Sequence, residues 1–379
     1  MTRRGPGEGS VFQRSDGLWT GSVSIGWGRE GRKRRYVYGH TQAEALAKLR
    51  KLQQQLGLGL PVVDEKVSLG AFLGRWLEGV ESRLRPSTFT RYKGLVNAQI
   101  TPKLGSVRLG QLKPSDVSRM MAEVQRDGLS PRTAAHCRAV LRAALSDAEK
   151  WGEISRNVAK LADAPHLPVP QPVVLSPDQV REIIEALPEP SLRRLAVVAI
   201  HSGLRLGEEL GLRWVDVDLE GHALHVRQCL QRVGGTYQLV EPKSSTSRRV
   251  VALPESALEA LREERRDQAA ARLAAGGRWH QPIPDLCFTT AAGQPRNGTS
   301  VTHLFQDALQ RAGLPHLRWH DLRAAHGSLL LAGGTDISVV SRRLGHSSIA
   351  LTSRHYGGVA DALQQAAADR LEAMLQRPG

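Results

Sequence analysis

The sequence predicts a multidomain protein that is mainly α-helical and carries small β-sheets. Its 379 residues exceed the usual size of one domain, so two or three domains are expected. Two breaks divide the chain, a glycine-rich one at residues 57–61 and one at residues 165–172 that holds four prolines. We therefore predict three domains, over residues 1–60, 67–164 and 173–379.

The first domain is predicted to be a three-stranded antiparallel sheet covered by one helix. Ser10 to Tyr38 holds short runs of β-branched and aromatic residues, broken at Ser15-Asp16-Gly17 and Gly28-Arg29-Glu30-Gly31. In the middle run, residues 19, 21, 23 and 25 alternate with polar residues, so we expect one core face and one polar face. A helix over residues 41–56 would cover the sheet.

Positive charge is concentrated in the first part of the chain. The net charge is +15, and residues 1–165 hold 28 Lys and Arg against 15 Asp and Glu. Such a balance favours a polyanionic partner, most simply nucleic acid. The basic run over residues 32–38 fits either a solvated hairpin edge or contact with DNA. We expect the front of the chain to hold DNA and the back to carry chemistry.

The second domain is predicted to be all-helical, over residues 67–161. Its clearest helix begins at Ser130-Pro131, an N-cap followed by proline at the first helical position. Arg138 and Arg142 lie off its apolar stripe, where solvent or phosphate is expected to meet them. The stripe is apolar at helical spacing and consists of Thr133, Cys137, Val140, Leu141, Ala144, Leu145 and Ala148.

The third domain is predicted to mix helices with one small sheet. Ser176-Pro177-Asp178 should cap its first helix, and a second helix leads into Gly203-Leu204-Arg205. Lys243 falls at the turn between the last two strands of the sheet. We predict three strands in that sheet, over residues 223–227, 237–240 and 249–253.

The cysteines and the hydropathy of the chain exclude several classes of protein. Cys137, Cys229 and Cys287 are isolated, so neither a disulfide framework nor a cysteine-rich zinc site is expected. The sequence shows no run of about 18 apolar residues and no signal-peptide core. We expect a cytoplasmic protein that does not contact a membrane.

Six residues of the third domain form a set able to grip and attack a phosphodiester. Every member except a tyrosine is a cation or a hydrogen-bond donor, and no nearby carboxylate pair is placed to hold a metal. We therefore expect neither a metal nor a cofactor. The predicted catalytic residues are Arg205, Lys243, His320, Arg323, His346 and Tyr356.

The order and spacing of these motifs resemble the tyrosine recombinases of the phage-integrase family. Gly203-Leu204-Arg205 with Glu208 resembles the family's first arginine box, and His320-Asp321-Leu322-Arg323 with Leu344-Gly345-His346 resembles its second. Lys243 falls where the family places its β-hairpin lysine. The resemblance implies an arm-type DNA-binding domain, a SAM-like core-binding domain and a catalytic domain, in that order.

The roles of the six residues follow from their chemistry. A tyrosine hydroxyl has a pKa of about 10 in model peptides, so Tyr356 needs a cationic site in order to attack. Arg205 and Arg323 offer rigid forks of donors to the phosphate oxygens. Lys243 is the natural general acid for the departing 5′-hydroxyl. His320 would donate a further hydrogen bond or help to move a proton, and His346 would orient the same phosphate or donate a hydrogen bond to it. The resemblance implies a 3′-phosphotyrosyl link that is resealed without ATP or metal.

Simpler interpretations exist for several of these residues. Arg205 could pair only with Glu208, which we expect to orient the site and not to act as a base. His316 and His320, predicted on one helical face, could bind a metal, but no HExxH glutamate or nearby cysteine accompanies them. The run Ala324-Ala325-His326 departs from the family, where His or Thr often follows the arginine directly, and this concerns local packing.

The predicted function is site-specific recombination that integrates and excises a phage or other mobile element. Its expected partners are double-stranded DNA at attachment sites, three further copies in a tetramer, and DNA-bending and directionality proteins. The apolar residues over 360–375 would pack onto a neighbouring subunit or onto the chain's own domain. The alternatives are a type IB topoisomerase-like enzyme and a recombinase-derived DNA-binding protein without activity.

Overall fold

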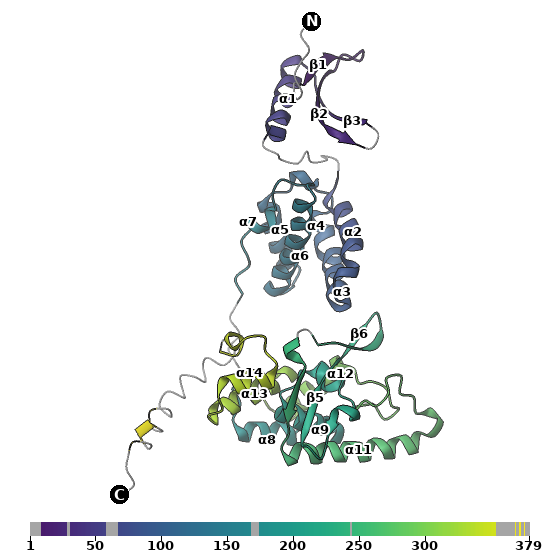
Figure 1. Cartoon of the computed structure of the whole chain (residues 1–379), viewed down its shortest axis with the longest axis vertical. Helices are drawn as coiled ribbons and strands as arrows, with labels where there is room; N and C mark the ends of the chain where they lie inside the picture. The colour runs from purple at the N-terminus through teal and green to yellow at the C-terminus, as the bar shows by residue number, and fades with distance from the viewer. Residues whose placement is uncertain are drawn as a thin grey trace. The chain divides into compact units, whose positions relative to one another are not determined.

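The computed structural model describes residues 9–28, 31–57, 67–167, 174–242 and 245–353, with 368, 371, 372 and 375. The chain forms two compact units, Met1–Pro168 and Val169–Gly379. It is mainly helical with small antiparallel sheets, which confirms the predicted fold class (Figure 1). The boundaries proposed for three domains stay a prediction.

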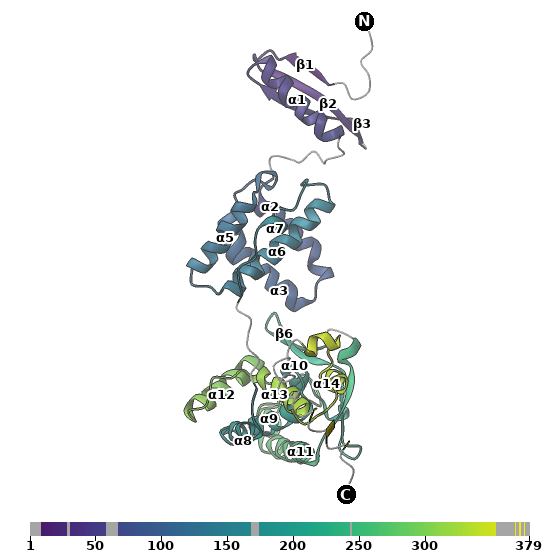
Figure 2. The ribbon, with the colours of Figure 1, turned by 90° about the vertical axis from the view of Figure 1, so that its left-hand side faces the viewer.

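The first unit begins with the predicted three-stranded sheet and its helix. Strands β1 (Ser10–Gln13), β2 (Trp19–Gly28) and β3 (Gly31–Gly39) are antiparallel in the order β1-β2-β3. Helix α1 (Gln42–Gly57) lies along the sheet (Figure 2), where Leu49 and Leu52 pack with Val23. Both the strands and the covering helix are confirmed.

The face of β2 predicted to be polar is buried at Thr20 and Ser22 and half-buried at Ser24. Thr20 and Ser22 are both buried, and the Ser22 hydroxyl lies 2.9 Å from that of Ser10. The residues opposite them on β3 are Tyr38 and Tyr36. Large side chains on the neighbouring strand therefore flank these short polar ones.

The rest of the first unit is helical, as predicted. Ser130 caps α6 by accepting a hydrogen bond from the Thr133 amide, and the apolar stripe is buried except that Ala134 takes the place expected for Thr133. Arg138 differs from the prediction, because its Nε donates to the Ala162 carbonyl at 2.8 Å. The helices are α2 (Leu69–Val80), α3 (Pro86–Leu95), a π-helical stretch (Val96–Ile100), α4 (Thr101–Leu104), α5 (Pro114–Arg126), α6 (Pro131–Lys150) and α7 (Val158–Leu161), with 3-10 turns at Glu81–Arg83 and Leu109–Gln111.

The second unit is built around α9, which packs against α11 and α13 (Figures 1 and 2). Ser176 caps α8, as predicted. The main apolar core joins α9 to residues of α8, α11, α12 and α13 and includes the fully buried Phe288 and Phe305. A second, smaller cluster of Leu331, Val340 and Leu344 packs α14 against α13. Its helices are α8 (Pro177–Glu185), α9 (Pro190–Ser202), α10 (Leu206–Leu210), α11 (Glu255–Ala275), α12 (Gly298–Arg311), α13 (Trp319–Ala332) and α14 (Ile337–Leu344), with 3-10 turns at Trp214–Asp216, Ser245–Ser247 and Gly276–Arg278.

The sheet predicted for this unit was wrong in its membership. The three-stranded sheet has the order β4-β5-β8, whereas β6 and β7 form a separate hairpin. Gly234 and Gly235 both have positive φ and supply the two-residue turn that favours such a hairpin. The prediction overlooked this Gly-Gly signal and with it the first strand of the hairpin. The strands are β4 (Val217–Asp218), β5 (Ala223–Val226), β6 (Cys229–Val233), β7 (Thr236–Val240) and β8 (Arg249–Ala252).

No helix in the described part of the chain combines the length and the apolar character that crossing a membrane requires.

Candidate active site

Arg205 is placed by the tight turn between α9 and α10. Helix α9 ends at Ser202, and Gly203 follows with φ of 64°, the left-handed conformation that favours glycine. A Cβ at this position would lie 2.5 Å from the His326 ring, so glycine is required for space as well. Two residues later Arg205 forms the N-cap of α10. The Gly-Leu-Arg motif thus lets the chain reverse and leaves the arginine at the surface.

Glu208 holds Arg205 and a second, buried arginine at the same time. Arg205 Nη1 donates to Glu208 Oε1 at 2.7 Å, and Arg249 Nη2 donates to Oε2 at 3.0 Å. Burial acts to raise the pKa of the Glu208 carboxyl, but Arg249 and Arg205 outweigh it and lower that pKa. The predicted pairing of Arg205 with Glu208 is confirmed, and the carboxylate is ionised.

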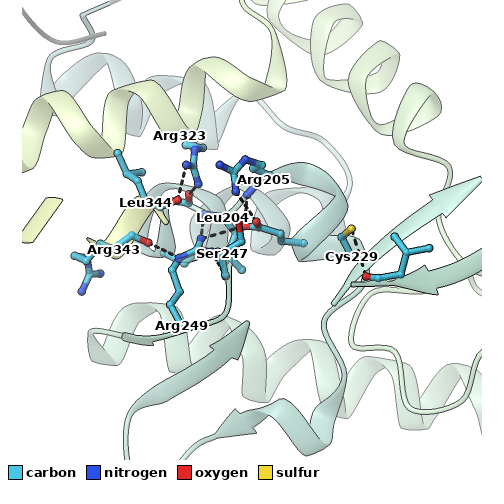
Figure 3. A network of polar contacts seen from close by, with 12 residues as sticks. Leu204, Arg205, Cys229, Ser247, Arg249, Arg323, Arg343 and Leu344 are labelled. Atoms are coloured by element: carbon cyan, nitrogen blue, oxygen red, sulfur yellow. Dashed lines mark hydrogen bonds and ion pairs between the residues drawn. The ribbon is translucent and has the colours of Figure 1, made fainter. Parts of the chain in front are cut away.

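Arg249 was not foreseen from the sequence as part of this network. Besides Glu208, it donates from Nη1 to the Ser247 carbonyl at 2.9 Å and from Nε to the Arg343 carbonyl at 2.5 Å (Figure 3). One guanidinium therefore joins β8, α10 and the last turn of α14. Nothing in the local sequence around Arg249 indicates these contacts, because they reach residues 41 and 94 positions away.

Arg323 lies on α13 and is only 3% exposed. Its Nη1 donates to the Gly203 carbonyl at 2.6 Å, and its Nη2 donates to the Leu344 carbonyl at 2.5 Å. Leu344 is the last residue of α14, where the helix dipole places partial negative charge. Arg323 thus ties together the Gly-Leu-Arg turn, its own helix and the Leu-Gly-His motif.

His320 is the second residue of α13 and is exposed. Desolvation of its ring and then the charge of Arg323 lower its pKa, with Asp321 opposing and Arg205 adding to the effect. Both predicted arginines therefore act on this one imidazole, which places the three groups in one neighbourhood. The lowered pKa favours the neutral ring at neutral pH.

His316 does not share a helical face with His320, so that prediction was wrong. Helix α13 begins at Trp319, and the residues from 314 to 318 form an extended approach to it. Asp321 ends the approach by accepting from the Arg318 amide at 2.8 Å. Among the described residues no group of three or more His, Cys, Asp or Glu could hold a metal.

Two further histidines line this region. His346 is half-buried, and its Nδ1 lies 2.8 Å from the hydroxyl of the buried Thr352. His326 is buried with its Nδ1 2.7 Å from the Ile200 carbonyl. Burial lowers the pKa of His326 to about 4, with further lowering by Arg343 and Arg323. The run Ala324-Ala325-His326, which departs from the family pattern, thus places the neutral His326 ring against Gly203.

Four of the six predicted catalytic residues lie in the described part of the chain, and the motifs of all four meet. Lys243 and Tyr356 fall outside the described residues, as does most of the predicted tail helix over 360–375. The described cluster offers guanidinium and imidazole donors around Arg205, whose side chain is 40% exposed. Such a cluster can bind an oxyanion and stabilise added negative charge on it.

Comparison with known proteins gives one consistent result. The model described as the phage integrase family matches residues 173–362, and that of the phage integrase N-terminal SAM-like domain matches residues 68–123. The chain is 28% identical to a tyrosine recombinase XerC-like protein of Caldanaerobacter subterraneus subsp. tengcongensis, covering 88% of this chain and 90% of that protein. It is also 28% identical to an integrase of Streptomyces ambofaciens, covering 93% of each.

Solved structures share the fold at lower identity. The Tn1549 transposon integrase in complex with transposon right end DNA has a TM-score of 0.67 at 20% identity, covering 78% of this chain and 99% of that one. A lambda integrase tetramer bound to a Holliday junction has a TM-score of 0.57 at 20% identity, covering 89% and 95%. These likenesses concern the fold.

Proposed function

We propose that this chain, which belongs to the phage integrase family and is a site-specific tyrosine recombinase, cuts and rejoins DNA through a 3′-phosphotyrosyl intermediate. The observation that supports the mechanism is that Arg205, His320 and Arg323 lie in one neighbourhood at the beginnings of α10 and α13. Glu208 is already engaged by two guanidiniums there. A carboxylate that is already paired in this way is not available to hold a metal, which supports direct binding of a phosphate by the cationic groups.

The proposed reaction has two balanced steps. The Tyr356 hydroxyl loses its proton to water as its oxygen attacks the phosphorus, the bond to the 5′-oxygen breaks, and Lys243 gives that oxygen a proton. Arg205 and Arg323 bind the non-bridging oxygens, while His320 and His346 donate hydrogen bonds. A 5′-hydroxyl of the partner strand then attacks the phosphotyrosine and gives its proton to Lys243, while Tyr356 leaves and regains a proton from water. One phosphodiester is exchanged for another, so no energy source is consumed.

We further propose that the substrate is double-stranded DNA at the attachment sites of a phage or other mobile element. The similar transposon and lambda integrases are recorded with transposon end DNA and, as a tetramer, with a Holliday junction. The excess of Lys and Arg before residue 166 supports DNA binding by the first unit. A homotetramer and accessory DNA-bending and directionality proteins remain predicted partners.

The test is adduct formation in EDTA without ATP. Nicked duplexes tiled from DNA flanking the gene are incubated with the wild-type protein and with Tyr356→Phe, and SDS-resistant complexes are counted. We expect an adduct with wild type that the variant lacks. Tight binding without an adduct on any duplex would favour the DNA-binding protein without activity.

A second assay separates recombination from topoisomerase activity. Wild type is given two duplexes that each carry the site found above, and joint products are measured beside relaxation of a supercoiled plasmid. We expect strand exchange between the duplexes. Relaxation of plasmid DNA that lacks the site, with no exchange, would favour the type IB topoisomerase-like alternative.

A further inference from the structure

Glu209 follows Glu208 in the sequence but lies in the opposite environment. It is 0% exposed, and its Oε2 accepts a hydrogen bond from Trp319 Nε1 at 2.8 Å. Its Oε1 has no hydrogen-bond partner among the described residues. Burial raises the pKa of the Glu209 carboxyl well above its ordinary value, the Trp319 bond offsets part of this, and the charge of Glu208 adds to it. Glu209 is therefore a neutral acid inside the core.

Trp319 is held from two directions. Its ring meets Phe305 of α12 edge-on, with 5.3 Å between centroids and 72° between the ring planes. Its indole N–H is held by Glu209. Trp319 is also the first residue of α13, directly before His320 and one turn before Arg323. Fixing this side chain fixes the first turn of the helix that carries both.

The other end of the hydrogen bond belongs to the short helix that Arg205 begins. Glu209 lies one turn after Arg205, and its amide donates to the Arg205 carbonyl at 3.0 Å. The bond from Glu209 to Trp319 thus joins α10 to α13. It acts beside the bond from Arg323 to the Gly203 carbonyl. These two hydrogen bonds attach α13 to the chain before and after the first residue of α10. Together they define the distance between α10 and α13.

We propose that Glu209 is a positioning residue, which sets the spacing of Arg205 from His320 and Arg323 across the bound phosphate through its bond to Trp319. This inference rests on the proposed function. An apolar pair of similar volume would fill the same space without leaving Oε1 unpartnered, so packing alone does not account for an acid here. A hydrogen bond adds what apolar contact lacks, namely a fixed direction and distance.

The test compares variants that keep or remove the acceptor. Glu209→Gln keeps an acceptor for the indole, whereas Glu209→Leu removes it and Trp319→Phe removes the donor. Single-turnover adduct formation and the Kd for the same nicked duplex are measured for each. We expect Glu209→Gln to stay close to wild type, and the other two to bind DNA normally but cleave about tenfold more slowly or worse. The double variant should be no slower than either single one, because both remove the same bond.

A matched control separates positioning from general loss of stability. Glu264 is another buried carboxyl of the same core, which accepts from Ser191 and from Arg194, both on α9. We expect Glu264→Leu to lower the unfolding midpoint and to leave the cleavage rate of the folded protein unchanged.

Each outcome has a distinct meaning. If wild type forms an adduct and both Glu209→Leu and Trp319→Phe cleave at its rate, the positioning inference is overturned while the proposed function stands. Equal slowing of Glu209→Gln and Glu209→Leu also overturns it, since the acceptor is then not what matters. If wild type forms no adduct on any duplex, the proposed function fails and the inference fails with it.

Discussion

The helical part of the first unit and the second unit differ in what they bury. Among the described residues from 67 to 167, Asn157 is the one polar residue that is buried. The second unit buries many, including Glu208, Glu209, Arg323 and His326. Apart from Asn157, the first core consists of apolar side chains, whereas the second also contains charged residues and acids, several of whose partners come from distant segments.

Under the proposed function, this difference corresponds to two ways of binding a phosphate. A surface that only attracts DNA can keep its cations in water, where they need no partners. A site that stabilises a transition state must hold its donors in fixed directions, which requires buried partners and costs desolvation. The second unit should therefore be the part of the chain that is sensitive to single substitutions and to pH.

The largest effect is expected from Arg249→Met. This change removes one partner of a buried ion pair and leaves the Ser247 and Arg343 carbonyls without that donor, which should destabilise the second unit by about 3–5 kcal/mol. The urea-induced unfolding of the second unit measures it. Arg83→Met, which breaks a pair with Asp147 at the exposed surface of the helical part, is the matched change and should cost under about 1 kcal/mol. Equal losses of unfolding free energy in the two variants would contradict the difference between the two parts of the chain.

Gly203→Ala should follow, with a loss of about 3 kcal/mol, because it combines a positive φ with a clash against the His326 ring. Gly74→Ala on α2 is the control, since a Cβ there meets nothing within 4 Å. It should be neutral or slightly stabilising. Thermal unfolding and the adduct rate are measured for both. A harmless Gly203→Ala would contradict the close approach that positions Arg205.

Acid should weaken the second unit through His326. The pKa of His326 in the folded protein is about 4, below its value in the unfolded chain. As pH falls, the unfolded chain therefore binds a proton before the folded protein does. The free energy of unfolding should decrease between about pH 6.5 and pH 4, by up to about 3 kcal/mol. The unfolding free energy is followed across this range in wild type and His326→Gln. The free energy of unfolding of His326→Gln should decrease less over this pH range. The exposed control His316→Gln should show the same decrease as wild type. Parallel curves for all three would argue against a buried neutral histidine.

The smallest effect is expected from Arg119→Ala in the helical part. Arg119 pairs with Asp116 one turn away and is mostly exposed, so its loss should change the unfolding free energy by under about 0.5 kcal/mol. Urea titration at low and high salt checks this. A change of several kcal/mol would mean that the helical part depends on charge as strongly as the second unit does.

Local signals account for what the sequence predicted correctly. Ser130-Pro131 and the stripe after it define α6, since caps and helical spacing act within a few residues. The Gly-Leu-Arg, His-Asp-Leu-Arg and Leu-Gly-His motifs are also local signals, and the structure brings these motifs into one neighbourhood. The catalytic roles of their residues stay a prediction. Gly234-Gly235 carried a signal of the same kind for the β6-β7 hairpin, and weighing it would have corrected the sheet.

The connections between motifs could not be predicted in this way. Arg249 reaches the Arg343 carbonyl, and Glu209 reaches Trp319 across 110 positions. No period or cap relates residues so far apart, and an acid beside Glu208 was expected at the surface because carboxylates are seldom buried. Which arginine holds a backbone carbonyl, and which faces the substrate, depends on tertiary packing alone.

The bond between Glu209 and Trp319 also limits how such a chain can change over generations. Replacing Trp319, or replacing Glu209 by a residue without an acceptor, leaves the other residue with a buried polar group that has lost its partner, which is costlier than having neither. A lineage that abandons the pair must pass through that weaker intermediate or change both positions at once. Descendants of this chain should therefore inherit the two residues together or lose them together.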